Sequence, residues 1–251
     1  FALIWNPKAG RTAKFSKSIP DLQDAFRERG AELDVQYISD ERPGREIARE
    51  LEGRVDGILI AGGDGTLHEC MRGMKTFATP VALLPLGTAN VLAQEIHVPG
   101  NPVDAAMLVF SGTVQLFDVG LANDAPFVLW CGVGLDAHIV HRVSASLKRL
   151  FGSIAFEMTG FREIPFYTPE RLHVVVDGKK KKGYFAIISN ITLYGGKLLF
   201  PDANPRDGLF DVLLVSDSSK FTFFRNYLGV SRHKPPKLSK VIRLRGKQVD
   251  I

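Results

Sequence analysis

The chain has 251 residues, of which 45% are hydrophobic, so it is long enough for one large domain or two smaller domains with real cores. Its net charge of +5 and its pI near 9.2 favour an anionic partner, such as a nucleotide or an acidic membrane surface. Two cysteines exclude a disulfide scaffold and make a reducing cytosol the simplest compartment, and no apolar run reaches the roughly 18 residues that a membrane span requires.

Strands and helices alternate through the first half of the chain. Apolar runs predict strands at residues 1–5, 33–38, 57–61 and 80–84. Helical periodicity with start and stop signals predicts helices at 19–29, 43–51, 66–77, 91–96 and 101–110. Strands that alternate with helices predict a parallel sheet with helices on both faces.

Three polar loops, residues 6–10, 62–66 and 85–90, each follow a strand of this predicted sheet. Ligands bind at the carboxyl ends of the strands in such sheets, so we expect all three loops to lie on one rim. The third loop offers a threonine hydroxyl at Thr88 and an amide at Asn90, and either side chain would also suit a helix cap.

Residues 62–66 read Gly-Gly-Asp-Gly-Thr and are the most informative stretch. Glycines allow the backbone to approach a ligand closely, and N–H groups at the start of the following helix suit a phosphate. Asp64 has the wrong charge for a phosphate unless a divalent cation lies between the two. The pattern indicates metal-assisted handling of a nucleotide polyphosphate, and the alternative is a tight turn with a capping Asp.

The second half of the chain reads as β-rich from about residue 115. Strands are predicted at 114–119, 126–131, 172–176, 184–189 and 209–215, with helical pieces within 135–164 and 219–230. Lys179 to Lys182 are predicted to form the exposed tip of a hairpin that turns at Asp177-Gly178, and an anionic bilayer is the alternative contact for these lysines.

Three further segments of the second half each allow a functional and a structural interpretation. Residues 132–137 match Gly-x-Gly-x-x-Ala, the pattern of a dinucleotide site. Residues 154–161 look helical and not like the second strand that such a site needs, which disfavours this interpretation. Asp136 would face a bound hydroxyl group or cap a helix. Residues 202–208 carry many oxygen ligands and suit either Mg²⁺ or Ca²⁺ or an Asx-rich turn without metal. The aromatic segment 150–167 suits a core or, if exposed, an acyl chain or membrane surface.

Motifs at 6–10, 62–67, 85–90, 132–137, 194–196 and 201–208 follow one order across nearly the whole chain. Together they resemble the diacylglycerol kinase catalytic-domain family, and more closely the soluble bacterial lipid kinases related to diacylglycerol and sphingosine kinases. The resemblance implies an α/β ATP-binding domain like those of NAD kinase and phosphofructokinase, residues 1–114, and a β-sandwich-type domain for the lipid substrate, residues 115–251. It also implies an active site in the cleft between these domains.

The resemblance implies an ATP-dependent and Mg²⁺-dependent kinase that phosphorylates a hydroxyl of a lipid such as diacylglycerol. Asp64 would act through the catalytic Mg²⁺, Asp136 would lie near the lipid head group, and a structural Mg²⁺ would be held by Asn204, Asp207 and Leu209. The residues expected to hold ATP are Asn6, Pro7, Lys8, Ala9, Gly10, Gly62, Gly63, Asp64, Gly65, Thr66, Leu67 and Thr88.

The chain departs from the family pattern in two places. Val91 stands where the family usually has an acidic residue, and the chain contains no Asp-Gly-Glu, the late motif whose Glu is the family's general base. We expect that Glu beyond Ile251, in a C-terminal segment missing from this chain. The alternatives are NAD kinase, which shares Gly-Gly-Asp-Gly-Thr, and a non-catalytic nucleotide-binding or lipid-binding regulatory relative.

The expected partners are ATP, a lipid substrate and the surface of a membrane, without nucleic acid. The basic residues do not follow a recognisable nucleic-acid-binding motif. We therefore expect a cytoplasmic protein that lies peripherally on the inner membrane face. The sequence predicts neither the particular lipid nor the oligomeric state.

Overall fold

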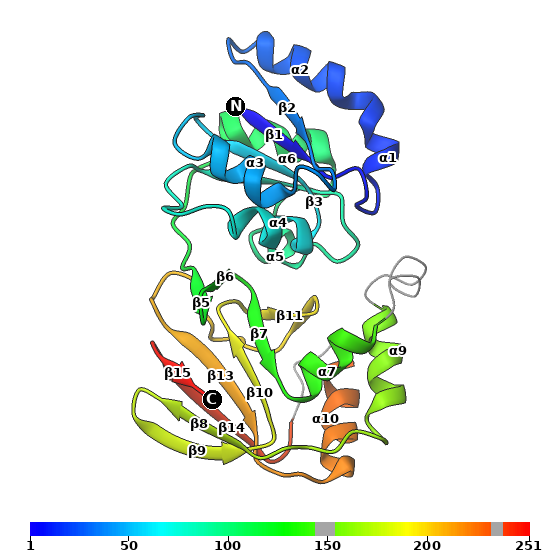
Figure 1. Ribbon diagram of the computed structural model, residues 1–251, viewed down its shortest axis with the longest axis vertical. Coiled ribbons are helices and arrows are strands. Elements are labelled where there is room, and N and C mark those ends of the chain that lie inside the picture. The colour runs from blue at the N-terminus through cyan, green and yellow to red at the C-terminus, as the bar shows by residue number, and fades with distance from the viewer. Residues whose placement is uncertain (144–153, 232–237) are drawn as a thin grey trace. The chain divides into compact units, whose positions relative to one another are not determined.

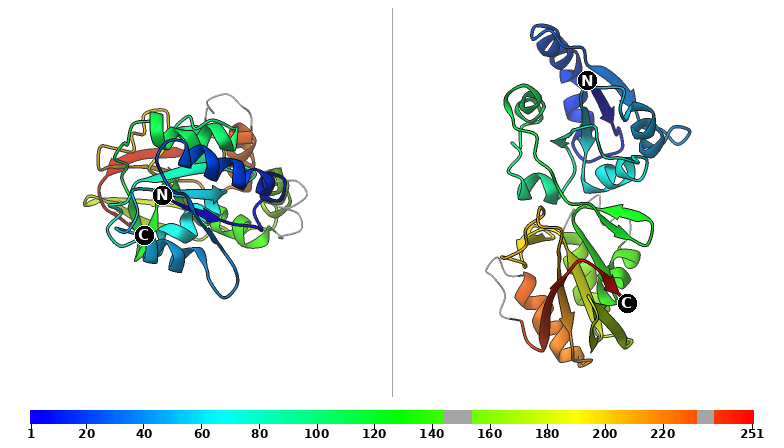
Figure 2. Two further views of the ribbon diagram at one scale, coloured as in Figure 1. Left: turned by 90° about the horizontal axis from the view of Figure 1, so that it is seen from above. Right: turned by 90° about the vertical axis from the view of Figure 1, so that its left-hand side faces the viewer.

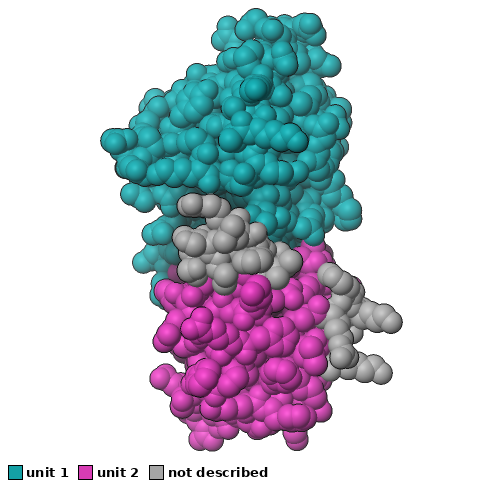
Figure 3. Space-filling view, turned by 90° about the vertical axis from the view of Figure 1, so that its right-hand side faces the viewer, with its two compact units in different colours: residues 1–116, 123–126 teal, residues 117–122, 127–251 magenta. Residues whose placement is uncertain are grey.

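The structure is a computed structural model that describes residues 1–143, 154–231 and 238–251 (Figure 1). The chain divides into two compact units (Figure 3). Unit 1 contains residues 1–116 and 123–126, and unit 2 contains residues 117–122 and 127–251. No helix of the described parts is long and apolar enough to span a bilayer.

Unit 1 is built on a four-stranded sheet in the order β2-β1-β3-β4, in which every neighbouring pair is parallel. Its strands are β1 (Ala2–Trp5), β2 (Asp34–Tyr37), β3 (Ile58–Gly62) and β4 (Val81–Pro85). Its helices are α1 (Thr12–Phe15), the 3₁₀ turn η1 (Ser16–Ser18), α2 (Ile19–Arg27), α3 (Gly44–Leu51), α4 (Asp64–Met71), α5 (Val91–Glu95) and α6 (Pro102–Ser111). The predicted parallel α/β domain is confirmed.

The central strands β1 and β3 are apolar throughout because helices cover both faces of the sheet, whereas the edge strand β2 carries Asp34 and Gln36. Successive strand residues point to opposite faces. Leu3 and Leu59 pack in a cluster with Leu22 and Phe26 of α2 and Ala106 of α6. The alternate strand residues lie on the other face, which α3 and α4 cover (Figures 1 and 2).

The helix predicted at 66–77 is displaced: α4 begins at Asp64 and ends at Met71. Beyond it, the Glu52 carboxylate accepts the backbone N–H groups of Lys75, Thr76 and Phe77, at 2.7, 3.0 and 2.7 Å. Phe77 takes a φ of +53°, outside the helical region. These N–H groups therefore bond to a side chain of a neighbouring element instead of continuing α4.

Unit 2 contains two antiparallel sheets. The larger sheet has the order β14-β13-β10-β7 and the smaller the order β15-β8-β9. Their strands are β7 (Trp130–Val133), β8 (Leu172–Val176), β9 (Lys179–Gly183), β10 (Phe185–Ser189), β13 (Phe210–Val215), β14 (Val241–Gly246) and β15 (Val249–Asp250). The remaining strands of the described residues form two short pairs: β5 (Gly120–Ala122) with β6 (Ala125–Phe127), and β11 (Leu193–Tyr194) with β12 (Lys197–Leu198).

The larger sheet is buried on both faces, and its sequence alternates between two cores. Ala186 and Ile188 of β10 pack with Val174 and Val176 of β8, so the two sheets form a sandwich. Ile187, between them in sequence, packs on the opposite face. The helices of unit 2 lie on that side of the larger sheet (Figure 1): α7 (Leu135–Arg142), α9 (Ile154–Glu163) and α10 (Lys220–Ser231). The predicted β-sandwich-type second domain is confirmed.

Several predicted elements of unit 2 are wrong in their limits. Residues 114–119 form no strand: Val114 and Leu116 are 73% and 87% exposed. The first strand after α6 is β5, which begins at Gly120. The strand predicted at 126–131 is divided between β6 and β7. In contrast, the helical pieces predicted within 135–164 are present as α7 and α9, and residues 144–153 lie outside the described residues.

The lysine run is a strand and not a hairpin tip. Asp177 and Gly178 both have positive φ, +44° and +81°, which suits a two-residue turn. The turn is therefore complete before Lys179, and the lysines continue as β9, whose residues pair with β8.

Candidate functional site

The three polar loops predicted to share a rim are joined by backbone hydrogen bonds in unit 1. The carbonyl of Gly62 accepts the N–H groups of Leu86 and Gly87, at 2.9 and 3.0 Å. The N–H of Arg11 donates to the carbonyl of Leu86 at 2.8 Å. The Asn6 amide donates to the Thr66 hydroxyl at 2.9 Å. The loops after β1, β3 and β4 thus form one continuous surface at the carboxyl ends of three adjacent strands.

The glycines of these loops are explained by how closely the backbones approach one another. A Cβ on Gly63 would lie 3.0 Å from the Cα of Gly87, and a Cβ on Gly87 would overlap with Gly63. A Cβ on Gly10 would lie 3.1 Å from the carbonyl oxygen of Leu86. In contrast, Gly65 is exposed and has no atom within 4 Å of the position where a Cβ would stand. Gly10, Gly63 and Gly87 therefore allow the loops to pack against one another, whereas Gly65 faces open space at the surface.

The Asp64 side chain caps a neighbouring helix. Its Oδ2 accepts the N–H of Val91 at 3.0 Å, and its Oδ1 accepts the N–H of Leu92 at 3.2 Å. A carboxylate at the N-terminus of α5 satisfies N–H groups that have no partner within the helix. Each carboxylate oxygen has a further lone pair, so the side chain also fits a Mg²⁺ ion that keeps most of its water ligands.

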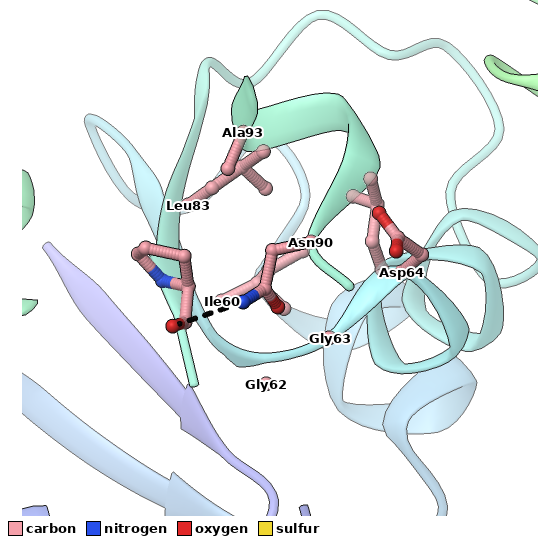
Figure 4. Close-up of a pocket in the computed structure, with 9 residues that line it drawn as sticks. Ile60, Gly62, Gly63, Asp64, Leu83, Asn90 and Ala93 are labelled. Carbon is pink, nitrogen blue, oxygen red and sulfur yellow. Dashed lines mark hydrogen bonds between the residues drawn. The ribbon is translucent and has the colours of Figure 1, made fainter. Parts of the chain in front are cut away.

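Asn90 shapes the loop between β4 and α5. It has a φ of +50°, and its amide nitrogen donates to the carbonyl of Gly87 at 2.9 Å. The same nitrogen donates to the carbonyl of Pro85 at 3.2 Å, the bond drawn in Figure 4. Its Oδ1 is buried and accepts no hydrogen bond from the described residues. The cavity that Asn90 lines with Asp64 measures about 10 Å³, so a nucleotide would rest on the outer surface of the loops and not inside this cavity.

Two basic side chains of the first loop, Lys8 and Arg11, could neutralise phosphates, and they have partners of different kinds. Lys8 forms an ion pair with Asp40 at 2.6 Å, and both side chains are largely exposed. Such an exposed pair contributes little to stability, so Lys8 can exchange Asp40 for another anion at small cost. The Arg11 guanidinium donates to the carbonyl of Pro85 at 2.5 Å and so holds the third loop. Thr88 is exposed on that loop.

In unit 2, Asp136 stands at the start of α7 and accepts a hydrogen bond from the Tyr194 hydroxyl. A Cβ on Gly132 would overlap with the Asp136 carboxylate, and Gly134 has a φ of +90° where β7 turns into α7. The Gly-x-Gly motif is therefore explained by the placement of Asp136. The helix α9 stands where a dinucleotide site needs a strand, so the dinucleotide reading is excluded.

Burial dominates the electrostatics of this pair. It raises the pKa of Asp136, although the hydrogen bond from Tyr194 opposes the shift. Burial and the nearby Asp136 raise the pKa of Tyr194 well above its usual value. The sequence motif at 194–196 does not indicate this role of Tyr194, because the contact joins residues 58 positions apart.

The predicted structural metal set shares its carboxylate with an arginine. The Oδ1 of Asp207 accepts the N–H of Leu209 at 3.0 Å, and its Oδ2 pairs with Arg245. The Oδ1 of Asn204 accepts the N–H of Arg206 at 3.2 Å. Residues 1–143, 154–231 and 238–251 contain no cluster of three or more His, Cys, Asp or Glu side chains that would hold a metal. Arg245 already supplies positive charge there, and the metal role of Asn204, Asp207 and Leu209 stays a prediction.

Asp118 holds the same turn and was missed at the sequence level. Its N–H donates to the carbonyl of Pro205 and its Oδ2 accepts the N–H of Gly208, both at 2.7 Å. The Asn190 amide donates to the Asp118 carbonyl, also at 2.7 Å. Because Asp118 fell within a predicted strand, no signal set it apart. It fixes residues 205–208 through contacts distant in sequence.

Two family models match the chain almost end to end. The diacylglycerol kinase catalytic domain matches residues 1–122, and the YegS C-terminal NAD kinase beta sandwich-like domain matches residues 130–251. The order of the two matches is the order of the α/β unit and the sandwich unit.

Curated relatives and a solved structure agree with these matches. A protein named diacylglycerol kinase from Bacillus subtilis (strain 168) is 27% identical over 230 residues, which cover 89% of this chain and 76% of that protein. One of the same name from Staphylococcus aureus (strain MRSA252) is 26% identical over 258 residues, which cover 99% of this chain and 81% of that protein. A crystal structure of a diacylglycerol kinase from Bacillus anthracis str. Sterne aligns with a TM-score of 0.73 at 25% identity, over 99% of this chain and 84% of that one. The chain therefore belongs to the diacylglycerol kinase catalytic-domain family, a family of kinases, in the form that carries this β-sandwich-like second domain.

Proposed function

We propose that this protein transfers the γ-phosphoryl group of ATP to a hydroxyl group of a membrane lipid such as diacylglycerol. The observation that carries the proposal is the continuous surface formed by residues 6–10, 62–66 and 85–90 in a member of this kinase family. Its glycines allow close backbone approach, and the carboxyl ends of parallel strands are where such sheets bind ligands.

The chain's own groups would divide the work as follows. Backbone N–H groups at the start of α4 would face the phosphates, beside Lys8 released from its exposed pair with Asp40. Asp64 would hold Mg²⁺ through its free lone pairs while its capping bonds keep the carboxylate fixed relative to α5. The metal, when bound, supplies positive charge to the transferring phosphoryl group.

The acceptor side of the reaction rests on fewer residues. The partly buried Asp136–Tyr194 pair would orient polar groups of the lipid, and the proton of the lipid hydroxyl needs a carboxylate base. The sequence contains no Asp-Gly-Glu motif to supply this base, so the identity of the base stays a prediction and the test uses the full-length protein.

The experiment separates the catalytic role of Asp64 from its capping role. Full-length protein, Mg²⁺ and γ-labelled ATP would be incubated with a lipid panel in mixed micelles and, separately, with NAD. Asp64→Asn keeps an oxygen for one capping bond but loses the negative charge, whereas Asp64→Ala loses both. Transfer to one lipid that both variants abolish, with a melting temperature lowered mainly in Asp64→Ala, supports the proposal.

Other results would contradict it. Label in NADP would assign the protein as an NAD kinase. Binding of ATP without transfer to any acceptor would indicate a regulatory relative. Full activity of Asp64→Asn would leave Asp64 with its capping role alone.

A further inference from the structure

An exposed aromatic face occupies one side of the helices of unit 2. Phe221 and Phe224 of α10 are 71% and 41% exposed, and Phe166, just after α9, is 81% exposed. Phe221 and Phe224 are three residues apart and so lie on the same side of their helix. The opposite side of α10 is buried through Thr222, Phe223 and Asn226, a set that already anchors the helix.

Two contacts join the exposed residues into one surface. The rings of Phe161 in α9 and Phe224 in α10 meet edge to face, with centroids 5.8 Å apart. The Lys220 ammonium donates to the carbonyl of Pro165 at 2.5 Å, which brings the start of α10 beside Phe166. Met158, 47% exposed, continues the surface along α9. We call this surface the aromatic face: Met158, Phe161, Phe166, Phe221 and Phe224.

The charges around the aromatic face are mainly positive. Arg162 and Arg225 are exposed beside it, one in each helix, and Lys220 lies at its edge. Nearby carboxylates are engaged within the unit: Glu157 pairs with Lys197, Glu163 with His138 at 3.0 Å, and Asp217 accepts the Thr222 hydroxyl at 2.6 Å. Aromatic side chains flanked by arginine and lysine are the composition of surfaces that lie in the head-group region of anionic bilayers.

We propose that the aromatic face docks this protein onto an anionic lipid bilayer. The phenylalanines would enter the boundary between head groups and acyl chains, and Arg162, Lys220 and Arg225 would contact lipid phosphates. The inference extends the proposed function, because a kinase for a membrane lipid must reach its substrate at the bilayer. It is independent of catalysis, since docking requires no ATP.

The lysines of β9 are the competing surface. Lys179 to Lys182 are all exposed, and a basic strand would also be attracted to anionic lipid. The aromatic face is favoured because it adds apolar side chains that insert into the interface, which the four consecutive lysines do not offer. The two surfaces predict a different salt dependence of vesicle binding. Binding through the lysines should be lost at high salt, where charge attraction is screened, whereas binding through inserted apolar side chains should persist.

The test measures co-sedimentation of the full-length protein with vesicles of phosphatidylcholine alone or with about 30% phosphatidylglycerol, without nucleotide. We expect binding to the anionic vesicles, and a roughly tenfold weaker partition constant for Phe221→Ser/Phe224→Ser. Val114→Ser/Leu116→Ser removes two exposed apolar side chains elsewhere, and we expect it to bind like the wild type. Arg162→Gln/Arg225→Gln should weaken binding at low salt more than at high salt.

Three results would overturn the inference. If Phe221→Ser/Phe224→Ser binds vesicles like the wild type and Lys180→Gln/Lys181→Gln does not bind, the docking surface is β9 and not the aromatic face. No binding of the wild type to either vesicle would exclude bilayer docking. A dimer that Phe221→Ser/Phe224→Ser dissociates would identify a second copy of the chain as the occupant.

A kinase assay with a short-chain diacylglycerol, dissolved as monomers, keeps the two proposals apart. Phe221→Ser/Phe224→Ser should phosphorylate it like the wild type and lose activity only on vesicle-bound substrate. Lipid docking without transfer to any lipid would contradict the kinase proposal and leave the docking surface standing.

Discussion

At the scale of single residues, several side chains have a structural explanation that is separate from chemistry. Asp64 caps α5, Asn90 bonds to two carbonyls of its own loop, and Gly132 leaves room for a carboxylate. Loss of activity on substitution at such a position therefore does not by itself identify a catalytic group. Measurements of stability and activity on the same variants are needed to separate the two roles.

Gly132→Ala is expected to destabilise unit 2 by about 1–3 kcal/mol, because the added methyl group would overlap with the Asp136 carboxylate. Thermal or urea unfolding of the full-length protein measures the change. Asp136→Ala in the same chain should remove part of the penalty, which a double-mutant cycle would report as coupling. Gly65→Ala, with no atom near its added Cβ in α4, is the matched control and should be no less stable than the wild type.

At the scale of elements, long-range side-chain bonds decide where helices and strands stop. Glu52, just after α3, accepts three N–H groups from the segment that follows α4, as well as the Thr76 hydroxyl at 3.0 Å. Burial raises the pKa of Glu52, but the hydrogen bonds outweigh it and hold the pKa below its ordinary value of 4.5. The charged carboxylate thus stabilises the loop between α4 and β4.

Glu52→Gln is expected to lower the free energy of unfolding by about 1 kcal/mol at neutral pH, since an amide oxygen accepts these bonds less strongly. Because the folded pKa is depressed, the stabilisation is present above about pH 4.5 and is lost as the pH falls through the folded value. Unfolding curves of wild type and variant should therefore converge at acid pH. Glu41→Gln, at an exposed glutamate, is the control, and a difference that persists at low pH would contradict this role.

The sequence predicted elements well where a local pattern carries the information. Apolar runs predicted the strands of the parallel sheet, and the glycine motifs predicted loops that the hydrogen bonds of Gly62 join. It failed where a distant partner decides: the end of α4 depends on Glu52, and the placement of residues 205–208 on Asp118. The prediction of a strand at 114–119 failed because an apolar pattern cannot show whether a partner strand is present, and none pairs with these residues in the described parts of the chain.

At the scale of the whole molecule, the two units differ in the kind of surface they offer. Unit 1 presents glycine-rich loops at the ends of parallel strands, and unit 2 presents an aromatic face on its helices. The first suits a phosphate-bearing ligand and the second an apolar interface. A ligand of each kind should therefore affect one unit more than the other.

A non-hydrolysable ATP analogue with Mg²⁺ is expected to slow hydrogen exchange of the full-length protein within residues 6–12, 62–67 and 86–92, with smaller effects at α10. At about 100 times its Kd the analogue should also stabilise unit 1 by roughly 2.7 kcal/mol. Exchange followed by mass spectrometry measures the pattern. Protection restricted to unit 2 would contradict the assignment of the nucleotide to the loops, and free adenosine is the control for contributions that do not need phosphate.

The strand β9 has a consequence for behaviour at high concentration. It ends the smaller sheet of the described structure, and the edge of a sheet offers backbone groups to which a foreign strand can add. Its four successive lysines place like charges on both sides of that edge. A second β9 brought to pairing distance, about 4.8 Å, would meet the same charges and be repelled. The charges of these lysines therefore oppose self-association through the β9 edge. Substitutions that neutralise them should lower the concentration at which the protein aggregates.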